Sequence, residues 1–196
     1  MPHTEVIDLS RAPGAREAWD APVWKVLLWS VAELLLVSNP WQVSSRLRRA
    51  VLVAFGARIG QQVLLRPRLR VRFPWKLSIG DRSWIGEDVW LHNQAPLTIG
   101  SDAVISQGTF ITTGSHDHRR DMGLITRPVV VGDGAWVTAR CVVLGGSRIG
   151  VSALVTPGTV VSGDVPDGMV FGQPGGVVQR PRFPADGIPT RASLRS

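Results

Sequence analysis

The stretch ITTGSHDHRR, residues 111–120, gathers side chains suited to acid–base chemistry. It places His116, Asp117 and His118 side by side. A histidine can take a proton from a hydroxyl near neutral pH, because its ordinary pKa lies close to that pH. The same stretch begins like one more unit of a repeat and then loses the period, so these side chains stand where a regular structure is interrupted.

The repeat has a period of six residues and starts at residue 59, with an aliphatic residue first and usually glycine or another small residue second. Units start at 59, 79, 85, 99, 105 and 111, and six more run in unbroken register from 131 to 166. The period predicts short strands and corners stacked as a parallel β-helix, with the aliphatic residues inside. Cys141 occupies a fifth position, which also points inward, so core packing accounts for it.

Two slips in register mark where the coil is interrupted. The step from 85 to 99 is 14 residues, two more than two hexads, and the step from 111 to 131 is 20 residues, two more than three hexads. The second gap holds SHDHRRDMGLITRP, which lacks the pattern. We therefore expect a loop projecting from the β-helix over about 112–128. Loops held on a rigid scaffold commonly carry chemistry.

The stretch LLRPRLRVRF, residues 64–73, predicts a strand before the regular coils, with its odd-numbered residues facing in and its arginines facing out. Basic residues are concentrated in this region, because nine lie between Ser44 and Ser78 with no acidic residue among them. The whole chain has a formal net charge of +7. Such a stripe attracts anions of any kind. No zinc-finger, RNA-recognition or helix-turn-helix signature accompanies it, so we expect no nucleic-acid partner.

The segment WDAPVWKVLLWSVAELLLVSNPW, from residue 19, predicts a helix. Asp20 can cap it, Pro22 suits its first turn, and the SNP motif at 38–40 ends it. Its apolar run of about 15 residues is shorter than the roughly 20 needed to cross a bilayer. Lys25, Trp29 and Glu33 share one narrow face, and nearly all other positions are apolar. The helix must therefore be covered by the rest of the domain, a neighbouring subunit or a membrane surface.

These features predict an all-β domain with an apolar N-terminal helix. The expected divisions are a flexible N-terminus over 1–18, a helical segment over 19–56, the β-helix over 57–172 and a partly disordered extension over 173–196. One cysteine allows no intrachain disulfide, which fits a reducing cytoplasm. The first residues lack the pattern of a signal peptide. We expect a cytoplasmic protein, with peripheral contact at the inner face of the membrane left open.

The hexads, the GSHDHRR loop and the closing VPDGMVFGQPGGVV together resemble the hexapeptide-repeat acyltransferases. FPWKLSIGD, ISQGTFITTGSHDH and the apolar segment before FGARIG are similar to the colanic acid biosynthesis acetyltransferases, relatives of the galactoside, maltose and nodulation-factor O-acetyltransferases. The resemblance covers residues 20–180. It implies a left-handed parallel β-helix, a homotrimer with active sites between subunits, and acetyl transfer from acetyl-CoA with no metal required.

The resemblance also implies roles for single residues. His116 matches the catalytic histidine, a general base that activates an acceptor hydroxyl for direct attack on the thioester. Asn93 and Asp117 are expected beside the acceptor. The residues expected to contact CoA are Trp136, Ala139, Pro157, Ser162 and Arg180. Relatives place arginines near the nucleotide phosphates where this chain has glycine and glutamine, so Arg180, just beyond, is the substitute.

The predicted function is thus an acetyl-CoA-dependent O-acetyltransferase acting on a sugar hydroxyl of a polysaccharide precursor or glycoside. Two alternatives stay open. One is a non-catalytic β-helix scaffold, which the basic stripe and the apolar helix would suit. The other is a metalloenzyme like the γ-class carbonic anhydrases, in which His92, His116 and His118 would supply the zinc ligands.

Overall fold

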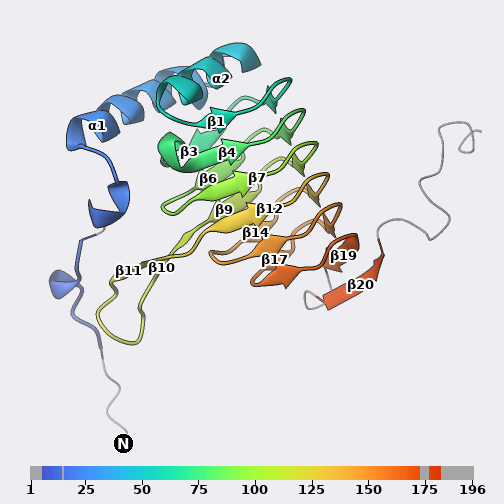
Figure 1. Cartoon of the computed structure of the whole chain (residues 1–196). Helices are drawn as coiled ribbons and strands as arrows, with labels where there is room; N and C mark the ends of the chain where they lie inside the picture. The colour runs from blue at the N-terminus through green and yellow to red at the C-terminus, as the bar shows by residue number, and fades with distance from the viewer. Residues whose placement is uncertain (1–5, 15, 173–176, 182–196) are drawn as a thin grey trace, which may run out of the picture.

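Short parallel strands stack on three faces of a prism and form the body of the molecule (Figure 1). The computed structural model describes residues 6–14, 16–172 and 177–181. Face A contains, in stacking order, β1 (Arg58–Ile59), β4 (Leu77–Ile79), β7 (Leu97–Ile99), β12 (Val129–Val131), β15 (Arg148–Ile149) and β18 (Asp164–Val165).

The other two faces continue each coil. Face B contains β2 (Leu64–Leu65), β5 (Trp84–Ile85), β8 (Val104–Ile105), β13 (Trp136–Val137), β16 (Leu154–Val155), β19 (Met169–Gly172) and β20 (Val177–Pro181). Face C contains β3 (Arg70–Val71), β6 (Trp90–His92), β9 (Phe110–Thr112), β14 (Val142–Val143) and β17 (Val160–Val161). Only β20 is antiparallel among these described strands, where it pairs with β19.

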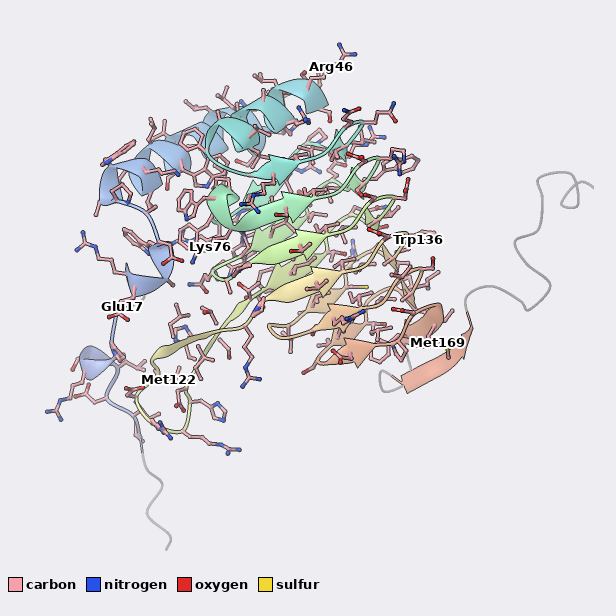
Figure 2. All side chains as sticks on the ribbon, in the orientation of Figure 1. Glu17, Arg46, Lys76, Met122, Trp136 and Met169 are labelled. Carbon is pink, nitrogen blue, oxygen red and sulfur yellow. The ribbon has the colours of Figure 1, made fainter. Side chains whose placement is uncertain are left out.

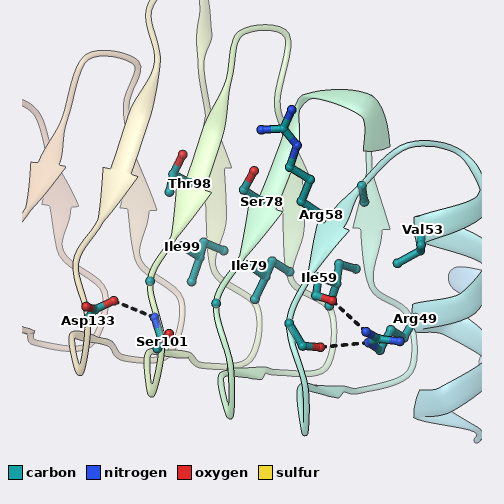
Figure 3. Close-up of a pocket in the computed structure, with 14 residues that line it drawn as sticks. Arg49, Val53, Arg58, Ile59, Ser78, Ile79, Thr98, Ile99, Ser101 and Asp133 are labelled. Atoms are coloured by element: carbon teal, nitrogen blue, oxygen red, sulfur yellow. Dashed lines mark hydrogen bonds between the residues drawn. The ribbon is translucent and has the colours of Figure 1, made fainter.

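The aliphatic residue of each hexad faces the interior because strand residues alternate between the two sides of a sheet. On face A, Ile59, Ile79 and Ile99 are in register and buried, whereas Ser78 and Thr98 point outward (Figure 3). Cys141 is also buried, and its thiol donates to the backbone oxygen of Thr156 at 3.2 Å. The predicted left-handed parallel β-helix is confirmed.

At several second positions of the hexad the residue is glycine, because consecutive coils approach closely there. A Cβ placed on Gly86 would lie 2.6 Å from the backbone nitrogen of Gln107 in the next coil. At Gly132 the corresponding distance to the backbone nitrogen of Val151 is 2.7 Å. Real Cβ atoms do not approach backbone atoms this closely, so the repeat's small residue is a packing requirement.

The sequence predicted one strand over residues 64–73, and this prediction is wrong. The segment forms two short strands, β2 and β3, separated by a corner at Pro67 and Arg68. The predicted sides are confirmed, because the odd-numbered apolar residues are buried and the arginines are exposed. This segment already belongs to the β-helix, and arginine replaces the usual small residue at its second hexad positions.

A helical layer covers the first coil of the β-helix (Figure 1). It consists of α1 (Val23–Ala32), the π-helix η3 (Glu33–Val37) and α2 (Ser45–Ala54). The SNP motif ends the first helical segment as predicted, since its cap is Ser38. The predicted cap at Asp20 is wrong, because Pro22 is the N-cap of α1 and Asp20 pairs with Lys76 instead. Within the described part of the chain, no helix is long and apolar enough to cross a membrane.

This helical layer supplies hydrogen bonds to the exposed edge of the first coil. Trp29 Nε1 donates to the backbone oxygen of Val71 at 3.0 Å, and Glu33 Oε1 accepts from the Val71 N–H at 2.7 Å. Ser45 Oγ accepts from the Leu65 N–H at 2.8 Å. The guanidinium of Arg49 donates to the backbone oxygens of residues 59 and 60 (Figure 3). An uncovered strand edge would leave these groups open to pairing with other chains, so the helices protect the end of the stack.

One edge of the prism, between faces C and A, carries all the interruptions of the early coils. The 3-10 turn η4 (Pro74–Lys76) lies there in the first coil, a bend at residues 94 and 95 in the second, and a hairpin in the third. The hairpin strands are β10 (Gly114–His116) and β11 (Leu124–Thr126). The N-terminal 3-10 turns η1 (Leu9–Arg11) and η2 (Arg16–Trp19) precede α1. We call this edge the C–A edge.

The predicted domain limits stay predictions. Among the residues expected to form a C-terminal extension, 173–176 and 182–196 lie outside the described residues, and 177–181 form β20. Residues 1–5 and 15 of the expected N-terminal segment also lie outside the described residues.

Candidate functional site

The hairpin that carries His116 projects from the C–A edge (Figures 1 and 2). Its strands pair Gly114 with Thr126 and His116 with Leu124. The tip is closed by the Asp117 N–H, which donates to the Gly123 oxygen at 2.9 Å. At the base of the hairpin, Gly114 lies against the side-chain amide of Gln94, which would have to move to admit a Cβ. The loop predicted over about 112–128 is therefore an ordered antiparallel hairpin.

The ring of His116 is oriented by the backbone of its own hairpin. Its Nδ1 lies 2.8 Å from the carbonyl oxygen of Met122. A carbonyl can only accept, so Nδ1 must carry the hydrogen, and the neutral ring then keeps its basic lone pair on Nε2. Met122 adopts a left-handed backbone conformation, with φ of 59°, in the turn that presents this carbonyl. The side chain of His116 is exposed, so Nε2 is accessible to a substrate.

His116 borders a cleft of about 390 Å³ between the hairpin and the following coils. Besides the hairpin residues, its lining includes Leu144, Gly145 and Ser162 from corners of later coils. Two arginines, Arg119 and Arg127, also border it. The cleft therefore places an oriented imidazole beside positive charge and an exposed hydroxyl, a setting suited to proton transfer on an anionic or polar substrate.

Asp117 holds the tip of the hairpin. Its carboxylate accepts from the Arg119 N–H at 3.2 Å and lies 3.7 Å from Arg120 Nε. These contacts give Asp117 a part in shaping the loop. The predicted contact between Asp117 and an acceptor stays a prediction.

Asn93 serves the packing of the early coils. Its side chain is buried, Oδ1 accepts from the Phe73 N–H at 3.1 Å, and Nδ2 donates to the Phe73 oxygen at 2.6 Å. Both ends of the amide are thus held by the backbone of the coil before. The predicted contact between Asn93 and an acceptor stays a prediction, and the geometry of the single chain does not support it.

The residues predicted to contact CoA do not form one site within a single chain. Ser162 lies in the His116 cleft on the C–A edge. Ala139 and Pro157 lie in consecutive coils on the corner between faces B and C, where the Gly158 N–H donates to the Ala139 oxygen at 3.0 Å. Arg180 is on β20, where its backbone is in register with Val170.

Trp136 stands farther from the hairpin. It lies on face B, away from the hairpin tip at Met122 (Figure 2). Its side chain is partly exposed, and Nε1 donates to Ser106 Oγ at 2.9 Å. Of the residues predicted to contact CoA, the single chain therefore brings only Ser162 next to His116.

Residues 16–20, which we call the N-terminal strap, pack against the C–A edge. The sequence did not predict this contact. Lys76 Nζ donates to the backbone oxygens of Ala18 at 2.6 Å and Gln94 at 2.7 Å, and it pairs with Asp20 Oδ2 at 2.7 Å. Glu17, Lys76 and Met122 lie along this side of the molecule (Figure 2). A second cleft of about 450 Å³ lies between the strap and the hairpin. No local pattern announced this contact, because it joins segments almost sixty residues apart.

The histidines proposed for zinc do not form a ligand cluster among the described residues. His92 Nδ1 lies 3.2 Å from Thr112 Oγ1, and its ring packs against Trp90 and Phe110. Burial, and then the nearby charges of Arg72 and Arg70, lower the pKa of His92. Among the residues that the structure describes, no three His, Cys, Asp or Glu side chains are grouped to hold a metal ion.

A larger hollow of about 620 Å³ lies along face A, and two of its charged side chains are already bound within the fold (Figure 3). Arg49 is bound to backbone oxygens, and Asp133 Oδ1 accepts from the Ser101 N–H at 2.7 Å. It contains an exposed cation, Arg58, but no histidine or cysteine. The His116 cleft is therefore the stronger candidate site.

Comparison with known proteins identifies relatives of the chain. No family model matches the chain. Over 157 residues it is 36% identical to the "Putative colanic acid biosynthesis acetyltransferase WcaF" of Escherichia coli (strain K12), covering 79% of this chain and 86% of that protein. Over 137 residues it is 22% identical to the galactoside O-acetyltransferase of the same organism, covering 68% of this chain and 66% of that protein.

Solved structures share the fold. The hexapeptide-repeat containing acetyltransferase VCA0836 from Vibrio cholerae is 25% identical, with a TM-score of 0.74, covering 85% of this chain and 98% of that chain. The same acetyltransferase complexed with acetyl coenzyme A, from Vibrio cholerae O1 biovar eltor, is 24% identical, with a TM-score of 0.73 over 86% of this chain and 98% of that chain.

Proposed function

The chain belongs to the hexapeptide-repeat acetyltransferases, and we propose that it transfers an acetyl group from acetyl-CoA to a sugar hydroxyl of a polysaccharide precursor or glycoside. The observation that carries the proposal is the orientation of His116, whose Nδ1 donates to the Met122 carbonyl and leaves Nε2 basic at the cleft. The donor is supported by the acetyl coenzyme A complex of the Vibrio cholerae relative. A sugar acceptor is supported by the names of the colanic acid and galactoside relatives.

His116 acts as the general base in this proposal. Its Nε2 takes the proton of the acceptor hydroxyl while the hydroxyl oxygen bonds to the thioester carbonyl carbon. The carbon–sulfur bond then breaks, and the imidazolium returns the proton to the departing CoA sulfur. The Met122 carbonyl supports both steps, because it holds the ring in one tautomer and stabilises the charged ring while the proton resides there.

The homotrimer belongs to the same proposal. Ala139 and Pro157 lie on a different edge of the prism from His116, so the predicted contacts are divided between two edges of the chain. A ring of identical subunits would place the corner between faces B and C of one subunit against the C–A edge of the next. Light scattering should then give a mass three times the chain mass of 21.3 kDa.

The test compares His116→Ala with His118→Ala. Both histidines are exposed on the same hairpin, but only His116 has its ring fixed by a backbone carbonyl. We expect His116→Ala to lower turnover by roughly 10²- to 10⁴-fold in an assay of CoA release with a panel of sugars. His118→Ala should stay near the native rate. Calorimetry should give both variants the native affinity for acetyl-CoA.

Three results would contradict parts of the proposal. Native turnover in His116→Ala would remove the base. No binding of acetyl-CoA to the native protein would remove the donor and favour a scaffold role. Turnover with amino sugars but not with hydroxyl acceptors would replace O-transfer by N-transfer.

A further inference from the structure

The first helical segment turns its apolar side away from the protein. Trp24 is 66% exposed, Leu27 62% and Leu34 67%. With their neighbours they form one continuous stripe at helical spacing, which we call the outer face: Trp24, Leu27, Leu28, Val31, Leu34 and Leu35. Isolated exposed apolar residues are ordinary, whereas a continuous stripe of this size marks a surface that contacts something else.

This orientation follows from the needs of the first coil. The opposite side of the helix carries Trp29 and Glu33, which satisfy the N–H and the carbonyl of Val71. Lys25, also on that side, stacks over the Trp75 ring with its Nζ 4.8 Å from the ring centroid. The polar groups must face inward to saturate the edge of the stack, so the leucines are left outside. The outer face is therefore fixed by the fold and cannot rotate into the core.

The same layer extends beyond α1 and η3. Trp41 is 88% exposed and Val43 80% exposed in the connection between the helices. Leu47 and Val53 are also exposed on α2. Exposed tryptophans at the margins of an apolar surface are typical of proteins that sit at a membrane interface, because an indole suits the boundary between apolar and polar phases.

Positive charge surrounds this layer. Arg46 lies on α2 and points away from the coils (Figure 2). Directly beneath the helices, the first coil carries five exposed arginines: Arg58, Arg66, Arg68, Arg70 and Arg72. Arg68 pairs with carboxylates of the next coil. Arg46, Arg58 and Arg66 form no ion pair with any residue that the structure describes.

We propose that this helical layer binds peripherally to a membrane surface that contains anionic phospholipids, with the outer face among the acyl chains and the arginines at the level of the phosphates. Interfacial helices insert their apolar faces about 5–10 Å into this boundary, and nearby basic side chains bind the anionic headgroups. Face-to-face packing with a second copy would oppose two arginine rims, and like charges at close range repel. The charge pattern therefore favours a lipid surface over a second copy of the chain.

The test is sedimentation of the full-length protein with extruded vesicles, independent of any acetyl transfer. We expect binding to vesicles of phosphatidylcholine mixed with phosphatidylglycerol, weaker binding to phosphatidylcholine alone, and weakening by salt. Leu27→Gln combined with Leu34→Gln should lower the partition coefficient at least about tenfold. The matched control, Val130→Gln with Val151→Gln, changes two exposed valines on later coils and should bind like the native protein.

A second pair of variants tests the charge. Arg46→Gln with Arg66→Gln should weaken binding to the anionic vesicles by about five-fold for each arginine. Arg140→Gln with Arg148→Gln removes two exposed arginines from later coils and should have little effect. If the first leucine pair lowers the melting temperature, Leu28→Gln with Leu35→Gln gives an independent test of the outer face.

Two results would overturn the proposal. One is failure of the native protein to bind anionic vesicles. If light scattering also shows that the assembly loses half or two thirds of its mass in the leucine variant, the outer face is an interface between copies of the chain. The other is native vesicle binding by both leucine pairs.

Discussion

Replacing Asn93 with alanine separates two roles for this residue, support of the fold and contact with an acceptor. Its amide makes two buried hydrogen bonds, at 3.1 and 2.6 Å, with the backbone of Phe73, which is itself buried. The Phe73 carbonyl also accepts from the Lys76 N–H at 3.0 Å, so losing Asn93 removes one of its two bonds at a cost of about 1 kcal/mol. The Phe73 N–H would be left buried without a partner, which costs about 1–3 kcal/mol. We therefore expect Asn93→Ala to lower the free energy of unfolding by about 3 kcal/mol.

The assay is thermal unfolding followed by circular dichroism, combined with acceptor kinetics well below the transition. For a chain of this size, about 3 kcal/mol corresponds to a fall of roughly 9 °C in melting temperature. Thr98→Ala, a change on the exposed side of β7, is the control and should stay within about 0.5 kcal/mol. A native melting temperature together with a raised KM for the acceptor would refute the structural role and restore the predicted acceptor contact.

Two further predictions concern the early coils and the repeat. Burial raises the pKa of Glu33, although the Val71 hydrogen bond and the charges of Arg70 and Arg72 act in the opposite direction. The protonated carboxyl therefore contributes stability that is fully present below the ordinary glutamate pKa. That stability is lost as pH rises through the pKa of Glu33 in the folded protein. Glu33→Gln keeps an acceptor for the Val71 N–H. Its free energy of unfolding, measured with urea, should therefore rise relative to that of the native protein as pH increases to neutral. A difference between the two proteins that stays constant across pH would contradict this. Gly86→Ala should lower the free energy of unfolding by about 3 kcal/mol or more, because its Cβ would meet the backbone of the next coil. Gly158→Ala should lower it by only about 1 kcal/mol, because the site has open space and only a φ of 70° to strain. Equal melting temperatures of the two variants would show that the coils can move apart at little cost.

The fold could be predicted because the same packing pattern recurs in many hexads of the sequence. The coils need aliphatic residues inside and glycine where the next coil approaches most closely, as Ile79 and Gly86 illustrate. The first coil was assigned as one strand because arginine stands at positions 66 and 72, where the repeat usually has a small residue. A period identifies which side of a strand is buried, but it does not reveal where a strand ends.

The candidate site was predicted less completely. The break in the repeat identified the hairpin and His116, since a segment without the pattern cannot lie in the stack. The ring orientation of His116 depends on a carbonyl six residues away, across a turn that only the folded hairpin defines. The contact between Lys76 and the N-terminal strap joins segments about sixty residues apart, and the hydrogen bonds of Asn93 to Phe73 join segments about twenty residues apart. No local sequence pattern could therefore predict either contact.

The sequence by itself determined the stacked coils, their inward and outward residues, the place of the interruption and the family. The tertiary structure alone decided that the interruptions share one edge, that Asn93 is committed to Phe73, and that the predicted CoA contacts lie on separate edges. It also decided which side of the first helix faces the protein. The reason is that a six-residue period specifies the environment of a residue within its own coil, whereas hydrogen bonds between coils and across the helical layer depend on how the coils stack.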